Sequence, residues 1–349
     1  MAEQTVSQAR SLRSNPRHYP RKLLVNLYNF CTGRQPRKPL PETPESILIQ
    51  APEKLGDAVL LLPLLKGLIE KFPALRLDII SSTKSSYLFE ELPFVSAVLK
   101  YRSPGQNLKE QLAGRQFHIF YNPKDHPSIT AFQLARLVKA DVKVCLYHEK
   151  HNQHYNYSLP NRESSPIVEK NGELLRAYGV KFPLKNFFPV KKLKSRGSSK
   201  LIALNVSSGD KNRIWPLENW LKLVQEIIDL DEKFSFLLFA MKPEHSSAEI
   251  MKEKFNEKIE YPLFSPHLFE AGSIIQNCDL LISADTALVH VAAAVGTPVL
   301  GLYSGDKRNR ERYIPYRIDF EIVNSVRLNI KDVKPEEVIT AFRSIIKRI

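Results

Sequence analysis

Short apolar runs alternate with amphipathic segments along the chain from Ser46 onward. In the first half, strands are predicted at residues 46–50, 76–82, 95–101, 117–122 and 142–148. Helices are predicted at residues 56–72, near 108–112, at 127–139 and at 166–180, and residues 151–165 are polar and irregular. Apolar strands separated by amphipathic helices indicate a parallel sheet that is covered on both faces.

The same alternation restarts after a basic, serine- and glycine-containing stretch at residues 185–200, which is typical of a hinge. Strands are predicted at residues 201–206, 234–240, 279–283 and 298–303, with helices at 216–228, 244–255, 268–278, 286–295 and 334–349. The two halves are alike, so we expect an α/β fold with two doubly wound domains that face a cleft. The predicted domains are residues 45–190 and 191–349. The sequence also allows the terminal helix to pack back on the first domain.

Residues 1–44 lie outside this pattern and read as a basic extension and linker. They hold eight Lys/Arg and two acidic residues, which is +6 of the net charge of +14. Within them, residues 21–30 (RKLLVNLYNF) predict a short amphipathic helix with basic residues at its start. Such a helix could lie on an anionic bilayer or pack on the folded body, and the pattern favours neither.

The net charge distinguishes this chain from an ordinary globular protein, whereas its composition does not. An apolar content of 43% with 25% charged residues is ordinary for a globular protein, whereas +14 points to an anionic partner: nucleic acid, a membrane surface or a phosphorylated substrate. No apolar run approaches the roughly 20 residues of a membrane-spanning helix, and no secretory signal is recognisable. Three distant cysteines without CxxC spacing suit a reducing compartment, so a cytoplasmic location is expected.

Three strand-to-helix junctions carry polar residues where α/β sheets bind ligands, beyond the carboxyl ends of strands. The first is LIQAPEKLGDAV, in which Asp57 falls at the start of a helix. An aspartate there usually caps the helix, and spacing alone favours this structural interpretation over a chemical one.

The second junction is NVSSGDKNRIWPLENW, which places Lys211 and Arg213 just before a helix. Main-chain amides at a helix start together with a cation form an anion site, so this loop predicts phosphate binding, with a solvated surface loop as the alternative.

The third junction is SADTALVHVAAAVGTP. Asp285 and Thr286 follow a strand, and His290 lies about one helical turn further on, within reach of the same ligand. A histidine on an Ala/Val helix is more often a core residue.

The histidines at 148, 151 and 154 are expected at the surface, and no metal site is predicted there. The chain has no GxGxxG, P-loop or GxSxG motif.

Taken together, the three stretches resemble glycosyltransferase family 9, the bacterial lipopolysaccharide heptosyltransferases. LGDAVLLLPLL matches the family's GD followed by an apolar helix with a proline, and RIWP matches its K-x-W-P loop in part. DTALVHVAAAVGTP matches D-T-G-x-x-H-x-A-A-A-x-G-x-P. The resemblance spans residues 46 to about 316. It implies a GT-B fold of two Rossmann-like domains, with the acceptor held by the N-terminal half and the nucleotide-sugar by the C-terminal half.

The resemblance also implies roles for individual residues. Asp57 takes the position of the catalytic base, which reverses the capping interpretation, and Arg213 takes that of a phosphate-binding lysine. The donor-binding Asp-Thr-Gly corresponds to Asp285, Thr286 and Ala287, and the family's histidine to His290. Glu244 is a match to a ribose-binding acid. Arginine for lysine keeps the charge but changes the geometry, and Ala287 adds a methyl group where the family has glycine.

The function expected from this resemblance is an inverting transfer of heptose from ADP-L-glycero-D-manno-heptose to a lipopolysaccharide inner-core acceptor. Arg213, Lys211 and the amides of Thr286 and Ala287 would stabilise the departing diphosphate, so neither a metal ion nor a cofactor is expected. The expected partners are a phosphorylated glycolipid of the lipid A-core type and the anionic cytoplasmic face of the inner membrane, and no nucleic acid. The alternatives are a hexose donor on the same fold, or a non-catalytic protein that binds glycolipid or nucleic acid.

Overall fold

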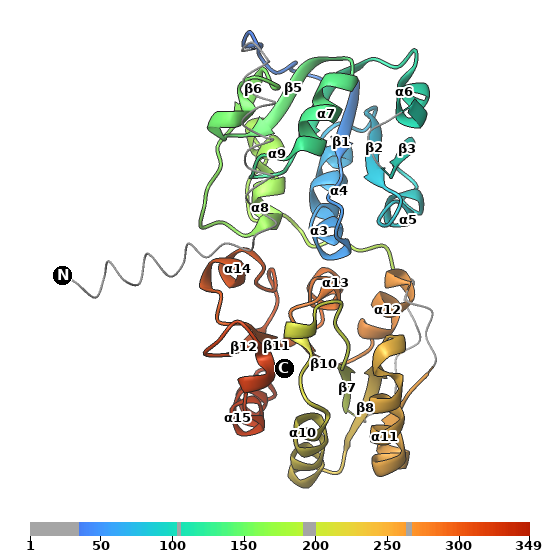
Figure 1. Ribbon diagram of the computed structural model, residues 1–349, viewed down its shortest axis with the longest axis vertical. Coiled ribbons are helices and arrows are strands. Elements are labelled where there is room, and N and C mark those ends of the chain that lie inside the picture. Colours follow the sequence, from blue (N-terminus) through green and yellow to red (C-terminus); the bar gives the residue numbers. More distant parts are fainter. Residues whose placement is uncertain (1–34, 103–105, 191–199, 263–266) are drawn as a thin grey trace, which may run out of the picture. The chain divides into compact units, whose positions relative to one another are not determined.

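The computed structural model describes residues 35–102, 106–190, 200–262 and 267–349. The amphipathic helix predicted at residues 21–30 lies outside these ranges. The chain folds into two compact units, each built on one parallel sheet (Figure 1). The first unit contains the described residues within 35–51, 72–86 and 94–161, and the second contains residues 52–71, 87–93 and the described part of 162–349.

The first unit has a six-stranded parallel sheet in the order β3-β2-β1-β4-β5-β6. Its strands are β1 (Ser46–Gln50), β2 (Arg76–Ser82), β3 (Ala97–Tyr101), β4 (Phe117–Asn122), β5 (Ala140–Leu146) and β6 (Tyr157–Leu159). Its helices are α6 (Gln106–Leu112), α7 (Ile129–Leu137) and the short 3₁₀ turn η1 (Glu149–His151). β6 pairs with β5 in a segment expected to be irregular, because pairing at a sheet edge stabilises a run too short to be recognised alone.

The surface position predicted for the three histidines is wrong for two of them. His151 and His154 are buried, and the ring of His154 stacks on Phe132, with 4.1 Å between the ring centroids. His151 Nδ1 is bonded to the carbonyl oxygen of Leu146 at 2.8 Å. Aromatic packing and this hydrogen bond therefore draw polar rings into a core that the surrounding polar sequence does not suggest.

The second unit has a six-stranded parallel sheet in the order β12-β11-β10-β7-β8-β9. Its strands are β7 (Lys200–Asn205), β8 (Phe234–Phe239), β9 (Ile259–Glu260), β10 (Leu280–Ala284), β11 (Val299–Tyr303) and β12 (Phe320–Asn324). The helices that follow these strands are α10 (Leu217–Leu230), α11 (His245–Phe255), α12 (Leu268–Ile275), α13 (Ala287–Val295), α14 (Lys307–Arg312) and α15 (Pro335–Ile345). The terminal helix α15 packs on α10, β11 and β12.

The two sheets have the same strand topology. In each, the first and fourth strands in chain order lie side by side, and the later strands add outward on both sides. This confirms the predicted α/β class with two doubly wound halves. The strand order reverses at the β1–β4 pair and at the β7–β10 pair, and such a reversal is where open α/β sheets leave a crevice for a ligand.

The helix predicted at residues 56–72 is two helices, α3 (Leu55–Val59) and α4 (Leu62–Lys71). Pro63 causes the break, because it lacks an N–H and its ring clashes with the carbonyl group four residues earlier. Within the break, the carbonyl oxygen of Leu60 accepts a hydrogen bond from Asn171 Nδ2 at 2.9 Å. α3 and α4 belong to the second unit, since α3 contacts α13 and α4 contacts α8 (Ile167–Asn171) and α9 (Glu173–Ala177).

Candidate active site

The candidate site lies at the carboxyl edge of the second sheet, where the strand order reverses between β7 and β10. The chain leaves β7 through a loop that ends in a 3₁₀ turn, η2 (Lys211–Arg213), and leaves β10 through Asp285 and Thr286 into α13. Each strand has a buried apolar centre and a buried polar residue near its end, Asn205 in β7 and Ser283 in β10. Polar side chains from two separate segments therefore meet at one edge.

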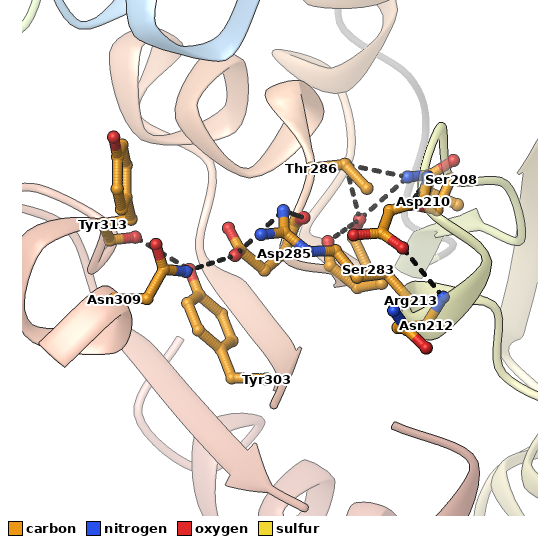
Figure 2. A network of polar contacts seen from close by, with 12 residues as sticks. Ser208, Asp210, Asn212, Arg213, Ser283, Asp285, Thr286, Tyr303, Asn309 and Tyr313 are labelled. Atoms are coloured by element: carbon orange, nitrogen blue, oxygen red, sulfur yellow. Dashed lines mark hydrogen bonds and ion pairs between the residues drawn. The ribbon is translucent and has the colours of Figure 1, made fainter. Parts of the chain in front are cut away.

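An ion pair joins the two segments. Arg213 Nη1 lies 3.1 Å from Asp285 Oδ2 and also donates to the main-chain carbonyl oxygen of Asp285 (Figure 2). The Asp285 side chain is 8% exposed, whereas that of Arg213 is 31% exposed, so the guanidinium keeps one side toward solvent. Asn309 Nδ2, from α14, donates to the same carboxylate oxygen at 3.2 Å. Three elements thus converge on one carboxylate.

Burial determines the protonation of this carboxylate. Desolvation raises the pKa of Asp285 above 3.8; the charge of Arg213 and the bond from Asn309 lower it, and the charge of Asp57 raises it again. The net shift is upward. The carboxylate is therefore a buried anion that the neighbouring cation compensates only in part.

Thr286 is fixed by side chains from β7 and β10. Asn205 Nδ2 donates to Ser283 Oγ at 2.9 Å and to Thr286 Oγ1 at 3.0 Å. Thr286 is the N-cap residue of α13, but its side chain forms no capping bond to that helix. Its hydroxyl is turned to the strand ends instead, and Ala287 opens the helix. The main-chain N–H groups at the start of α13 remain available to an anion.

His290 is buried one turn into α13. It is 4% exposed, and its Nδ1 has no hydrogen-bond partner among the described residues. Burial, followed by the charge of Arg213, lowers the pKa of His290 to about 4, so its imidazole is neutral at pH 7. A buried ring nitrogen without a partner costs free energy unless a ligand satisfies it.

The start of α3 packs against the start of α13. A Cβ added at Gly56 would stand 3.2 Å from His290 Cδ2 and 3.5 Å from Ala287 Cα, so the close approach depends on glycine. Asp57 follows in the first turn of α3, whose N-cap residue is Lys54. Its negative charge adds to the burial that raises the pKa of Asp285. The structure therefore brings Asp57, Arg213, Asp285 and His290 into one neighbourhood.

The other two candidates lie further along the same edge. Lys211 is exposed at the start of η2. Glu244 ends the 3₁₀ turn η3 (Lys242–Glu244) after β8, is 8% exposed, and its Oε2 has no hydrogen-bond partner within the described part of the chain. The loop after β8 is tied to the loop after β7, since Met241 N donates to Ser207 Oγ at 2.6 Å. Within the described ranges, no hydrogen bond or ion pair joins Glu244 to the Arg213–Asp285 pair.

Sequence reasoning did not identify Asn205, Ser283 and Asn309. The first two carried a signal, because each is a polar residue at the end of an otherwise apolar strand. Asn309 carried none, since it lies inside the charged run GDKRNRER. Among the described residues no group of three His, Cys, Asp or Glu could hold a metal ion, and no helix is long and apolar enough to cross a membrane.

Known proteins are similar to this chain in sequence pattern and in fold. The sequence model of glycosyltransferase family 9 (heptosyltransferase) matches residues 106–340. Among curated proteins no match was found. The fold is similar to that of a family 9 glycosyltransferase from Veillonella parvula, with a TM-score of 0.70 and 17% identity over 87% of this chain and 98% of that one.

Two structures from E. coli are similar to the same degree. Heptosyltransferase WaaC with ADP has a TM-score of 0.70 and 15% identity, over 86% of this chain and 99% of that one. ADP-heptose LPS heptosyltransferase II has a TM-score of 0.68 and 17% identity, over 87% of this chain and 99% of that one. At such identities the likeness concerns the fold, and it confirms the predicted GT-B architecture.

Proposed function

The chain belongs to glycosyltransferase family 9, and from this premise we propose that it transfers a heptose from an ADP-linked donor to a lipopolysaccharide inner-core acceptor. The family assignment makes the protein a glycosyltransferase. The donor is proposed because one similar structure is a heptosyltransferase with ADP and another is named an ADP-heptose LPS heptosyltransferase. The acceptor is proposed as a phosphorylated glycolipid at the cytoplasmic face of the inner membrane, which suits the net charge of +14.

One observation carries this proposal: the packing of α3 on α13 at Gly56. Because of it, the carboxylate of Asp57 and the cation of Arg213 lie around the same helix start. A transfer between a nucleotide-sugar and an alcohol needs a base for the alcohol and a positive site for the leaving diphosphate. A binding protein would need only the second.

In the proposed reaction the acceptor oxygen attacks the anomeric carbon from the face opposite the diphosphate. The new C–O bond forms as the bond to the diphosphate breaks, and Asp57 takes the hydroxyl proton. An aspartate is too weak a base to ionise an alcohol beforehand, so the proton moves late, when the attacking oxygen has become acidic. General-base positioning of this kind contributes about 10²–10⁴-fold.

The leaving diphosphate gains negative charge at the start of α13. Arg213, Lys211 and the main-chain amides of Thr286 and Ala287 are proposed to stabilise that charge, so the transfer needs no metal ion. Asp285 is proposed to orient Arg213, and the neutral His290 Nδ1 to bond to the donor. Glu244, buried with an unpaired Oε2 among the described residues, is proposed to accept from a ribose hydroxyl.

The test replaces Asp57 with Asn and with Ala, and compares both with Glu53→Gln, which removes an exposed acidic charge in the same loop. Transfer from ADP-heptose to isolated lipid A-core is measured together with ADP affinity by calorimetry. Asp57→Asn should lose about 10²–10⁴-fold in kcat while ADP affinity stays within a few-fold. Turnover within a few-fold of the parent protein at unchanged ADP affinity would remove Asp57 as the base.

The donor is tested separately by thermal shift with ADP-, UDP- and GDP-linked sugars. Stabilisation by the ADP series alone is expected, because a ligand that binds the folded state stabilises it by an amount that grows with the logarithm of its affinity. Stabilisation by UDP- or GDP-hexoses in its place would favour the hexosyltransferase alternative.

A further inference from the structure

The most exposed large apolar side chains of the described residues lie in one loop of the second unit. Val326 is 94% exposed and Leu328 is 72% exposed. They flank Arg327 in the turn that connects β12 to the 3₁₀ turn η5 (Ile330–Asp332). Single exposed apolar residues are ordinary, but two that share a loop tip with a cation between them form a small amphipathic surface.

The backbone of this loop, residues 325–329, is held in place. Ser325 Oγ donates to the carbonyl oxygen of Asn329 at 2.6 Å and accepts from Arg327 N at 3.1 Å. Gly305 N donates to the carbonyl oxygen of Arg327 at 2.7 Å. A Cβ at Gly305 would stand 2.9 Å from the carbonyl oxygen of Ser325, so this approach requires glycine. The apolar pair is therefore presented to solvent by a fixed turn.

Basic residues adjoin the apolar pair, both within the loop and at the start of α14. Gly305, which bonds to the loop, leads directly into α14, whose sequence KRNRER is mostly cationic. Residues 305–312 and 325–332 together carry six basic and three acidic residues. Lys307, Arg308, Arg327 and Lys331 are exposed. Lys307 pairs with Glu311 and Arg327 with Asp332, each at 3.8 Å, and such exposed pairs are weak, so the surface keeps a net positive charge.

The loop also adjoins the candidate site. η5 contacts η2, the turn that carries Lys211 and Arg213, and Trp215 Nε1 donates to the carbonyl oxygen of Val333 at 2.9 Å. The segments after β7, β10, β11 and β12 all leave the carboxyl edge of one parallel sheet. The amphipathic surface and the candidate site thus share one edge of the second unit.

We propose that the 325–329 loop and the exposed cations of α14 form a membrane-contact surface for an anionic phospholipid bilayer. Val326 and Leu328 enter the interface between headgroups and acyl chains, and Lys307, Arg308, Arg327 and Lys331 bind the headgroup charges. The exposed cations favour an anionic bilayer as the partner, because each Lys or Arg near an anionic membrane surface adds to the electrostatic attraction. The use of this surface to bring a lipid-borne acceptor to the site rests on the proposed function; the surface itself does not.

The experiment measures sedimentation of the full chain with vesicles of phosphatidylethanolamine and phosphatidylglycerol, and with neutral phosphatidylcholine vesicles. The double variant Val326→Ser/Leu328→Ser is compared with Ile250→Ser, which truncates an exposed apolar residue on α11. The loop variant should bind the anionic vesicles at least about tenfold more weakly, since interfacial binding scales with buried apolar area, and Ile250→Ser should bind as the parent protein does. Lys307→Gln/Arg308→Gln should weaken binding to the anionic vesicles alone.

Two results would overturn the proposal. One is unchanged vesicle binding of the loop variant, which would assign membrane contact to other parts of the chain. The other is a change in oligomeric state of the loop variant in the absence of lipid, which would identify the loop as a contact between copies of the chain. Transfer to a water-soluble, deacylated acceptor separates the two proposals. The loop variant should retain this transfer, because the acceptor needs no membrane. If the parent protein itself shows no such transfer, the result counts against the proposed function alone.

Discussion

Arg213 holds Asp285 at two points, the carboxylate Oδ2 at 3.1 Å and the main-chain carbonyl oxygen. Both contacts are made by one nitrogen, Nη1, and the planar guanidinium then fixes the directions of its other N–H groups, which a lysine ammonium could not do. The cation proposed to meet the donor diphosphate is thus oriented before the donor arrives. A preorganised charge of this kind stabilises a transition state without the cost of reorganisation.

The first prediction concerns the loss of this cation. Arg213→Ala should lower kcat/KM by about 10²–10³-fold and weaken ADP binding, because the diphosphate loses its partly buried cation. The kcat/KM and ADP affinity of Arg213→Lys should lie between those of the parent protein and of Arg213→Ala, since lysine keeps the charge but not the planar guanidinium. Steady-state kinetics and calorimetry with ADP measure both effects. Lys211→Ala is the control, and its loss should be smaller because Lys211 is exposed. Unchanged affinity and rate in Arg213→Ala would exclude Arg213 from the site.

The second prediction concerns the cost of the Asp285 charge. Burial raises the pKa of Asp285 above 3.8 despite Arg213 and Asn309, so the ionised carboxylate destabilises the folded state at neutral pH. This cost decreases as the pH falls through the raised pKa, and it vanishes below 3.8, where the group is protonated in both states. Asp285→Asn should therefore have a higher Tm than the parent protein at pH 7 and a smaller advantage at pH 4.5, while transfer falls at least about tenfold.

Thermal unfolding of both proteins between pH 4.5 and 7.5 measures the difference. If Asp285→Asn is less stable than the parent protein at pH 7, and this difference shrinks at pH 4.5, the attraction of Arg213 exceeds the cost of burial. Such a result would reverse the direction given for the pKa of Asp285.

The sequence predicted the parts of this architecture that depend on local pattern. Buried strands such as Leu280–Ala284 are continuous apolar runs, and the helices after them have amphipathic spacing, so both halves could be recognised. Helix interruptions were missed where one residue decides them, as Pro63 does between α3 and α4. β12 was missed because its burial is partial and its pairing with β11 is a tertiary effect.

The candidate site was predictable only in part for the same reason. Asp285, Thr286 and His290 lie in one motif, and Arg213 follows a strand in a glycine-containing basic loop. That Gly56 must touch His290 depends on the packing of two helices far apart in sequence, which no local pattern encodes. The role of Asn309 depends in the same way on where α14 folds back toward β10.

The third prediction concerns acid stability. Burial and Arg213 lower the pKa of His290 to about 4, so between pH 6.5 and 4 the unfolded chain binds a proton that the folded chain does not. His290 therefore costs folding free energy as the pH falls through this window, on the order of 3 kcal/mol at pH 4. His290→Gln should lose less stability than the parent protein between pH 7 and 4.5 in thermal unfolding.

His151 and His154 have pKa values lowered in the same direction, but both are present in the two proteins and cancel in the comparison. Parallel loss of stability in parent and variant would show that His290 titrates with an ordinary pKa. Titration of His290 should not change ADP binding to the parent protein between pH 6.5 and 8, because the imidazole stays neutral there.

The last prediction separates packing from stability at Gly56. Alanine in place of glycine in a helix favours folding by up to about 1 kcal/mol, so Gly56→Ala has no reason to lower Tm through α3 itself. The added Cβ, however, would stand 3.2 Å from His290 Cδ2, and α3 must shift from α13 by a few tenths of an ångström. Since Asp57 follows in the same turn, kcat should fall about tenfold or more while ADP affinity changes little. A variant with parent-like kcat would show that the distance between α3 and α13 does not position Asp57, whereas a large loss of Tm would mean that the contact serves folding.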